Sequence, residues 1–165
     1  MQHKWLNYII FCLIPVFTGC WYSFSGASVP PNTNTVAIPL FTNQAPLVYA
    51  PLSQLFTSKL QDKFLSQTNL KLRSESADLK LNGEITSYTL APATVQSNNE
   101  VVQNRLTMTV LVRYSNYQQS GDNWEQSFSN FVDFSGNFAD NQQRLSEEVS
   151  EKIAQDIFNR TLANW

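Results

Sequence analysis

The sequence predicts an α+β domain in which two helices pack on one face of a mostly antiparallel four-stranded sheet. Three segments between residues 79 and 134 alternate apolar and polar residues with a period of two, which is typical of strands with one buried face. One segment before them and one after them carry apolar residues at spacings of three and four, which indicates helices. Helices in this order cover one face of a sheet and leave the other face polar.

The N-terminus has the features of a bacterial lipoprotein signal. A short basic region precedes the apolar stretch Trp5–Phe17, which is too short to span a bilayer because a spanning helix needs about 20 apolar residues. The stretch ends in the string "FTGC", which resembles a lipobox, although Phe17 stands where an aliphatic residue is usual. We therefore expect cleavage after residue 19 and a covalent lipid on Cys20. The alternatives are an ordinary signal peptide that is cut elsewhere, or an uncleaved anchor.

The predicted elements follow the signal in order. Residues 20–34 are small, polar and proline-containing, which favours an extended tether, and residues 35–165 suffice for a single domain. The first strand is predicted at Thr35–Phe41, with Pro39 restricting its far end to an edge or a bend. A helix is predicted at Pro51–Gln67, because proline suits a first helical turn. Its apolar face consists of Leu52, Leu55, Phe56, Leu60 and Phe64.

Three strands and a second helix complete the domain. The strands are predicted at Leu79–Thr86, Arg105–Tyr114 and Trp124–Phe134, and residues 116–123 supply a hairpin turn between the last two. Asp140 or Asn141 is the predicted cap of the final helix, because short polar side chains accept hydrogen bonds from the first helical N–H groups. Its apolar positions are Leu145, Val149, Ile153, Ile157 and Leu162.

Composition excludes several classes of function. The chain has 11 basic and 13 acidic residues, and removal of residues 1–19, which contain Lys4, leaves 10 against 13, a net charge of −3. Such a balance argues against nucleic-acid binding, which depends on many Lys and Arg contacts to phosphate. The only histidine is His3 and the only cysteines are Cys12 and Cys20, so residues 21–165 contain neither type.

Without imidazole or thiol, the mature chain has no Ser-His-Asp or Cys-His machinery, no internal disulfide and no typical zinc ligands. The carboxylates form no pair that stands out as a glycosidase-type acid and base, and caps or solvated faces explain Asp133, Asp140, Glu147 and Glu148 better. We therefore predict a binding or structural protein that is not an enzyme and has no metal. We expect no cofactor apart from the lipid on Cys20.

Two groups of residues are candidates for contact with a partner. The first is a polar face on the two longest predicted strands, which could meet the polar wall of a barrel or anionic sugar-phosphates. It consists of Arg105, Thr107, Thr109 and Arg113 on one strand and Ser127 and Ser129 on the next. The alternative is an ordinary solvated sheet face. The second is a basic group that is a candidate for lipid A phosphates, although nearby acidic residues dilute its charge: Lys59, Lys63, Lys71, Arg73 and Lys80.

Specific strings in the chain resemble one family. These are "TGCWYSFSGASVP", "TNTVAIPLFTNQAP", "LSQLFTSKLQDKFLSQTNLKL", "ADLKLNGEITSYTLAP", "NRLTMTVLVRY", "WEQSFSNFVDF" and "IAQDIFNRTLANW". Together they resemble the LptE family of the Bacteroidota type, which comprises outer-membrane lipoproteins of lipopolysaccharide transport and assembly. The resemblance covers nearly the whole mature chain, implies two helices on a four-stranded sheet, and carries the acylation site over to Cys20.

The resemblance also implies partners and a location. A family member would form a complex with the LptD β-barrel, plug its lumen, and assist insertion of lipopolysaccharide into the outer leaflet. It would be anchored by lipid on the periplasmic side of the outer membrane. The resemblance supplies no catalytic residues and no aligned lipopolysaccharide contacts. A different class of function is an alternative: a periplasm-facing lipoprotein that activates or scaffolds another envelope complex.

Overall fold

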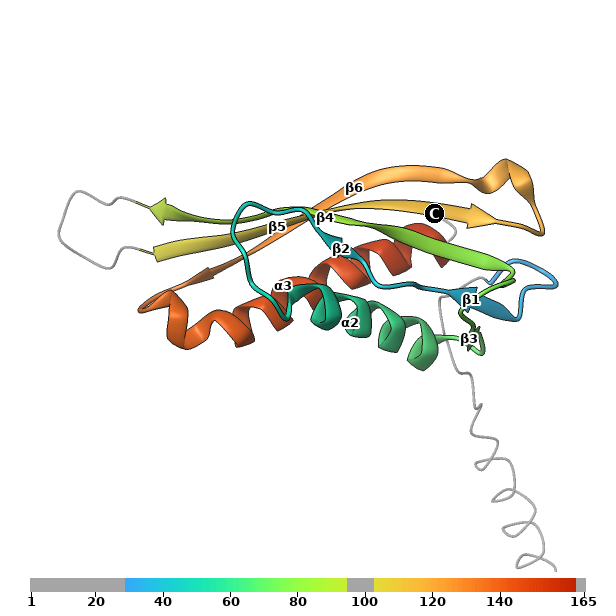
Figure 1. The fold of residues 1–165 in the computed structure, drawn as a ribbon, viewed down its shortest axis with the longest axis horizontal. Coiled ribbons are helices and arrows are strands. Elements are labelled where there is room, and N and C mark those ends of the chain that lie inside the picture. Colours follow the sequence, from blue (N-terminus) through green and yellow to red (C-terminus); the bar gives the residue numbers. More distant parts are fainter. Residues whose placement is uncertain (1–28, 95–102, 163–165) are drawn as a thin grey trace, which may run out of the picture.

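The domain consists of a layer of strands and a layer of two helices (Figure 1). The computed structural model describes residues 29–94 and 103–162, so the predicted signal peptide, Cys20 and most of the tether lie outside the described residues. The elements in chain order are β1 (Thr35–Ala37), β2 (Thr42–Asn43), α2 (Leu52–Gln67), β3 (Lys71–Leu72), β4 (Leu79–Thr94), β5 (Gln103–Asn116), the 3₁₀ turn η2 (Ser120–Asp122), β6 (Trp124–Phe134) and α3 (Phe138–Leu162).

The predicted α+β class, with two helices on one face of the sheet, is confirmed, but the predicted count of four strands is wrong. The sheet has six strands in the order β3-β1-β4-β5-β6, and β2 also pairs with β4. The long β4–β5 and β5–β6 ladders are antiparallel, whereas β1–β3, β1–β4 and β2–β4 are parallel, so the sheet is mixed. Strands β2 and β3 have two residues each, and two residues are too few for an alternation to be visible.

Strand β5 lies between β4 and β6 and shows the predicted alternation. Its inward residues, which are all buried, are Leu106, Met108, Val110, Val112 and Tyr114. Strand β4 pairs with it over nearly its whole length and continues eight residues beyond the predicted end at Thr86. A register shift between Ile85 and Ser87 interrupts the alternation there. This irregularity hides the second half of the strand from a period of two.

Helix α2 begins and ends close to its predicted bounds. Pro51 occupies the N-cap position, and Thr68 closes the last turn by donating from its N–H and its hydroxyl to the carbonyl of Phe64, at 3.1 and 2.7 Å. Leu52, Phe56, Leu60 and Phe64 are fully buried, whereas Leu55 is half-buried at the side of the stripe.

Helix α3 has the predicted apolar face but a different start. It begins at Phe138, and the Asn137 side-chain oxygen accepts a hydrogen bond from the N–H of Ala139 at 2.9 Å. The predicted cap at Asp140 or Asn141 is therefore wrong, and Asp140 lies in the first turn, where a carboxylate favours the helix dipole. The helix therefore begins closer to the end of β6 than the apolar periodicity alone indicates.

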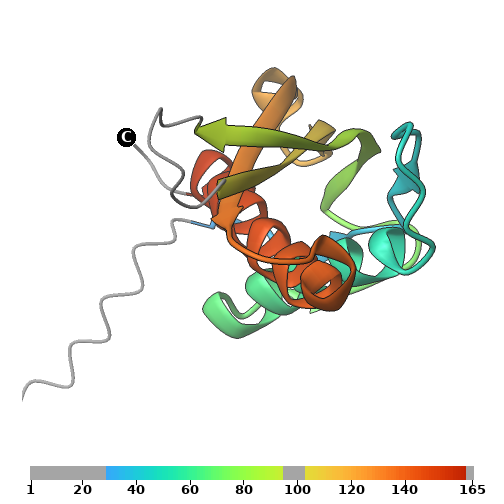
Figure 2. The same cartoon turned by 90° about the vertical axis from the view of Figure 1, so that its left-hand side faces the viewer.

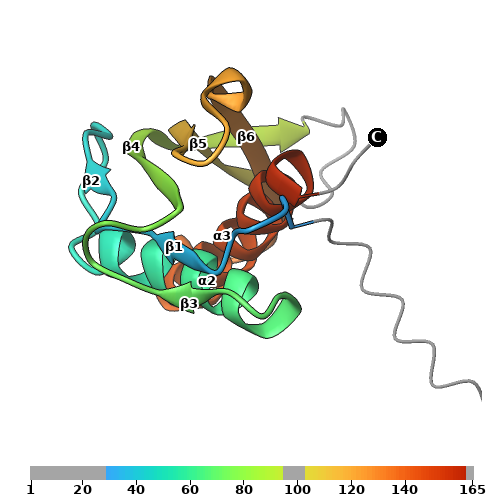
Figure 3. The ribbon, with the colours of Figure 1, turned by 90° about the vertical axis from the view of Figure 1, so that its right-hand side faces the viewer.

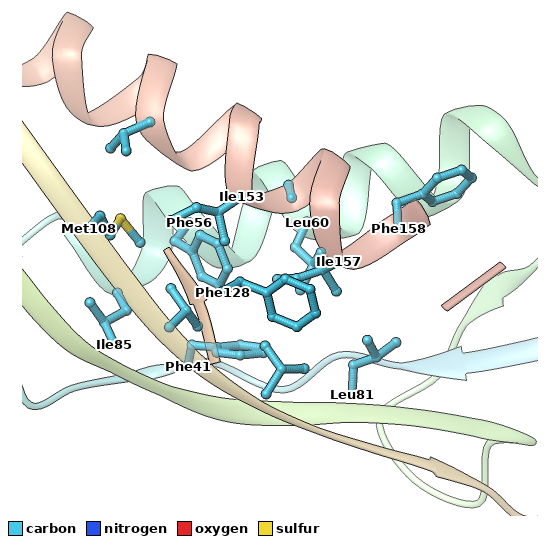
Figure 4. Close-up of a cluster of buried hydrophobic side chains, with 14 of the residues drawn as sticks. Phe41, Phe56, Leu60, Leu81, Ile85, Met108, Phe128, Ile153, Ile157 and Phe158 are labelled. Carbon is cyan, nitrogen blue, oxygen red and sulfur yellow. The ribbon is translucent and has the colours of Figure 1, made fainter. Parts of the chain in front are cut away.

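The core lies between the two layers and is rich in aromatic rings (Figure 4). Phe41, from the segment before β2, contacts Phe56 of α2 edge to face at 5.1 Å, and Phe64 contacts Phe158 of α3 at 5.3 Å. The Tyr88 hydroxyl lies 2.8 Å from the Ser146 hydroxyl, which itself donates to the Gln142 carbonyl. Tyr88 must therefore be the donor, and the hydrogen bond ties β4 to α3 inside the core.

Asp78 joins three segments at the start of β4. Its carboxylate accepts hydrogen bonds from the N–H groups of Asn34 and Thr35, the Thr35 hydroxyl and the Gln118 amide, at 2.7–3.0 Å. These donors belong to the start of β1 and to the turn after β5. Chiefly because of the hydrogen bond from Asn34, followed by that of the Thr35 hydroxyl, the pKa of Asp78 lies well below its usual range.

Gly83 gives the first test of the packing. A Cβ added there would lie 1.9 Å from the carbonyl oxygen of Leu111 and 2.9 Å from the Phe41 ring. We expect Gly83→Ala to lower the free energy of unfolding by about 1–3 kcal/mol or more, because backbone has to shift to admit the methyl group. Urea unfolding of the purified protein measures this. Gly121→Ala is the control, since its Cβ meets no atom within 4 Å, and an equal effect of both substitutions would contradict the prediction.

Asp78 predicts a pH dependence of stability. A carboxyl group whose pKa is lowered by folding contributes stability above its unfolded pKa of about 3.9, and this contribution is lost as the pH falls through the folded pKa. We therefore expect the stability of the wild-type chain to decrease below about pH 5 more steeply than that of Asp78→Asn, which is less stable at neutral pH. Chemical unfolding between pH 7 and pH 3 measures both slopes. Parallel slopes would show that Asp78 does not contribute.

Candidate functional site

The sheet face opposite the helices is the candidate contact surface (Figure 1). Arg105, Thr107, Thr109 and Arg113 all lie on this outer face of β5, so the structure brings together the four residues that the sequence grouped on this strand. The strand β6 adds the outward residues Glu125, Ser127, Ser129, Phe131 and Asp133. The strand β4 adds Glu84, Ser87 and Thr89, which pair with Leu111, Thr109 and Thr107 of β5. We call this set the outer face.

Arg105 closes one end of the outer face. Its guanidinium donates two hydrogen bonds to Asp133, from Nε to Oδ1 at 2.7 Å and from Nη2 to Oδ2 at 2.8 Å. It also lies over the ring of Phe131, 3.7 Å from the ring centroid. The hydrogen bonds raise the pKa of Arg105 and lower that of Asp133. A bidentate pair with a stacked ring holds the arginine in one orientation.

Arg113 forms the corresponding group at the other end. Its Nε donates to Glu125 Oε2 at 2.6 Å, and its Nη2 lies 3.4 Å from Glu84 Oε1. The hydrogen bond to Glu125 is the main reason why the pKa of Arg113 is raised. Between the two arginines, the hydroxyls of Thr109 and Ser129 lie 3.0 Å apart. Each end of the outer face therefore carries charges that are paired within the face.

This pairing makes a phosphate a less favourable partner for the outer face than a polar protein surface. The fork of Arg105 that could hold a phosphate is already occupied by a carboxylate, and Arg113 lies between two carboxylates. An incoming anion would have to displace them and would meet their repulsion. A polar protein wall faces no such obstacle, because hydroxyls and paired charges can exchange hydrogen bonds with it. The geometry favours a polar protein partner over a phosphate at this site.

The second group of candidates does not form one site. Lys59 and Lys63 lie on α2, and the Lys63 ammonium bonds to Glu151 of α3 with only 13 % of its side chain exposed. Lys63 therefore stabilises the contact between the helices. Lys71 lies in β3 and Arg73 directly after it, where both are exposed. These two are the exposed members of the group, whereas Lys59 is half-buried on α2.

Other features that could carry a function are clefts, metal sites and membrane-spanning helices. A cleft of about 520 Å³ lies between residues 74–78 and the turn after β5, and Ala37, Lys80, Tyr117 and Gln118 complete its lining. The described part of the chain contains no group of three His, Cys, Asp or Glu residues that could hold a metal ion. Within the same ranges no helix is long and apolar enough to cross a membrane.

The structure adds one surface that the sequence predictions missed. Residues 44–51, which join β2 to α2 and are called the apolar loop below, project beside the sheet (Figure 2 and Figure 3). Val48 is 80 % exposed and Leu47 38 %, and Leu40, just before β2, is 57 % exposed. The sequence does contain a signal for this apolar surface. No charged residue or histidine occurs between Lys4 and Lys59, although the chain has 11 basic and 13 acidic residues.

Comparison with known proteins identifies the family. The profile described as "LptE: Lipopolysaccharide-assembly" matches residues 33–161, which is most of the chain. The chain belongs to the LptE family. The resemblance inferred from the strings is thereby confirmed, and the family is one of lipopolysaccharide-assembly lipoproteins. No curated protein sequence matches this LptE-family chain.

Solved structures share the fold of this LptE-family protein. A protein of Helicobacter pylori, described as a homologue of the neuraminyllactose-binding hemagglutinin, is 14 % identical with a TM-score of 0.54, and the match covers 84 % of this chain and 88 % of that one. A hypothetical protein of Chlamydia trachomatis is 11 % identical with a TM-score of 0.51, covering 80 % and 99 %. The PelC dodecamer of Paraburkholderia phytofirmans is 10 % identical with a TM-score of 0.50, covering 81 % and 90 %. At these identities the likeness concerns the fold.

The pairing on the outer face of this LptE-family protein can be tested by reversing one charge. Arg113→Glu places a third carboxylate beside Glu84 and Glu125, so we expect a lower melting temperature at low salt. Added salt should restore part of the loss, because exposed charges are screened. Thermal unfolding at two salt concentrations measures this. Arg73→Glu is the control, since the described residues give Arg73 no ion pair, and equal losses would contradict the assigned pairing.

Proposed function

We propose that the protein is a lipid-anchored outer-membrane subunit that binds an LptD-type β-barrel and plugs its lumen during lipopolysaccharide transport and assembly. Membership of the LptE family supports a role in lipopolysaccharide assembly. The observation that carries the finer proposal is the outer face, which is uncovered by helices, broad across three strands, and carries two arginines and three carboxylates that are paired with one another.

The outer face suits the inside of a barrel on energetic grounds. The lumen of a membrane β-barrel is polar, so a plug must bring polar surface against polar surface. Isolated charges are costly to bury at an interface, whereas charges that are already paired lose less when water leaves. The pairs Arg105–Asp133 and Arg113–Glu125 meet that condition. The hydroxyls of Thr109 and Ser129 add donors and acceptors that need no charge partner.

The lipid anchor follows from Cys20. Several acyl chains anchor a protein stably, since each buried methylene contributes about 0.8 kcal/mol and a single chain binds only marginally. Residues 20–34 then connect the anchor to the domain on the periplasmic side of the outer membrane. No acidic residue follows Cys20 within this tether.

The candidate contacts divide between two roles in this proposal. Arg105, Thr107, Thr109 and Arg113 contact the barrel wall. Lys71 and Arg73, which are exposed at and after β3, are the residues left for phosphate groups of lipopolysaccharide. The proposal requires no catalytic residue and no cofactor beyond the lipid on Cys20.

Purification of the tagged full-length protein from outer membranes in a gentle detergent tests the proposal. We expect one large heat-modifiable barrel to accompany the protein in a near-equal amount. Thr107 pairs in register with Thr89 and Phe131 at the middle of the outer face, so Thr107→Arg adds a bulky unpaired charge there. It should reduce the recovered barrel at least about tenfold, equivalent to about 1.4 kcal/mol.

Gln143→Arg is the matched control, because it adds the same side chain to an exposed position on α3. It should leave the recovered barrel unchanged. If the wild-type protein brings down no barrel but a soluble periplasmic protein instead, the plug proposal is wrong. The activator or scaffold function would then replace it.

A further inference from the structure

The apolar loop and the charge-free segment that contains it require an explanation beyond the outer face. Of the 24 charged residues (11 basic plus 13 acidic), only Lys4 precedes Lys59. Folding buries part of the segment, but Leu40, Leu47 and Val48 stay exposed. Scattered exposed apolar residues are normal, whereas a cluster within nine residues that also excludes charge indicates a surface covered by something else.

Hydrogen bonds and a ring stack hold both ends of the apolar loop. At its start, the Asn43 side-chain oxygen accepts a hydrogen bond from Ala45 N–H at 3.0 Å, and Gln44 N–H donates to the Ile85 carbonyl at 2.9 Å. At its end, the Tyr49 ring stacks on Tyr88 with centroids 6.4 Å apart, and Leu52 N–H donates to the Tyr49 carbonyl. The exposed tip at Leu47 and Val48 is therefore fixed at both sides. A preformed loop loses little conformational entropy on binding.

The apolar loop also adjoins the outer face. Thr42 of β2 is in register with Glu84 of β4, the residue that contacts Arg113 across the outer face. Neighbouring residues on paired strands point to the same side of a sheet, so Thr42 extends the outer face by one strand. The burial pattern agrees: Phe41 is buried, whereas Leu40 and Thr42 on either side of it are exposed.

We propose that the apolar loop is the hydrophobic anchor of the barrel contact, with Val48 and Leu47 inserted into an apolar pocket of the same protein partner that the outer face binds. This inference rests on the proposed function. A polar surface with paired charges gives specificity more than affinity, and interfaces usually depend on a few well-packed apolar residues. The loop supplies such residues beside the polar strands.

Two other occupants fit less well. A second copy of the chain is disfavoured because a stable interface buries about 1,200–2,000 Å² in total, far more than the tip of one loop provides. A lipid surface is disfavoured because segments that lie on bilayers are rich in Lys and Arg on their polar face, and residues 29–58 contain neither. A protein pocket needs neither a large separate area nor basic residues.

The test uses the tagged full-length protein and the same detergent purification. We expect Leu47→Asp/Val48→Asp to reduce the recovered barrel at least about tenfold, because carboxylates cannot enter an apolar pocket without a partner. The melting temperature should stay within about 2 °C of the wild type, since both side chains are exposed. Leu65→Asp is the matched control, because Leu65 is 42 % exposed on α2, away from the loop, and it should retain the barrel.

A second measurement detects the contact directly. Residues 21–165 contain no cysteine, so Val48→Cys introduces a single thiol into the mature chain when Cys20 is acylated. Alkylation of this thiol by a maleimide should be at least about tenfold slower in the barrel complex than in the free protein. Leu65→Cys should react equally fast in both.

The outcomes separate this inference from the proposed function. If the double variant keeps the barrel, or Val48→Cys is not protected, the loop is not the anchor although the plug proposal stands. If the wild-type protein brings down no barrel, both are wrong. Vesicles of phosphatidylethanolamine and phosphatidylglycerol provide the last test, with residues 21–165 produced without signal or lipid. Sedimentation of this chain with the vesicles, lost on Val48→Asp, would assign the loop to lipid and overturn the inference.

Discussion

The fold depends on a sheet that is covered by helices on one side only. Every second residue of β5 from Leu106 to Tyr114 is buried beneath α2 and α3, and the residues between them face outward. Hydrophobic burial on one face fixes the register, because a shift by one residue would turn every apolar side chain to solvent. The same constraint brings Arg105 opposite Asp133 and Arg113 opposite Glu125. The candidate site is thus a consequence of how the core is packed.

Sequence periodicity was enough to predict the helices and strands that are long and regular. Both helices and the strands around β5 were predictable because each repeats its pattern many times. The short strands were not, since β2 and β3 have two residues each and form only through pairing with segments far along the chain. The second half of β4 was hidden by the register shift after Ile85. Local patterns cannot reveal structure that long-range contacts create.

The residues of the candidate site could be predicted from the sequence, but the ion pairs that they form could not. Outward residues on one strand could be grouped from their spacing alone. The partners of Arg105 and Arg113 lie on other strands, so their pairing required the register of β5 against β4 and β6. Lys63 looked like part of a basic group and is instead bonded to Glu151 of the neighbouring helix. The charge-free stretch before Lys59, by contrast, was visible in the sequence and only gained meaning from the exposure of Val48.

The parallel pairing of β1 also governs the order in which the chain can fold. Thr35 receives its partner Asp78 from 43 residues further along, after α2 and β3. The β4–β5–β6 meander, in contrast, connects neighbours in sequence and can form early, because short loops close at a lower entropic cost. The N-terminal segment can thus be incorporated only after α2, β3 and β4 have been made, although it is made first. Until β4 accepts it, this uncharged and apolar stretch is exposed, so it is the part of the nascent protein most in need of protection from aggregation.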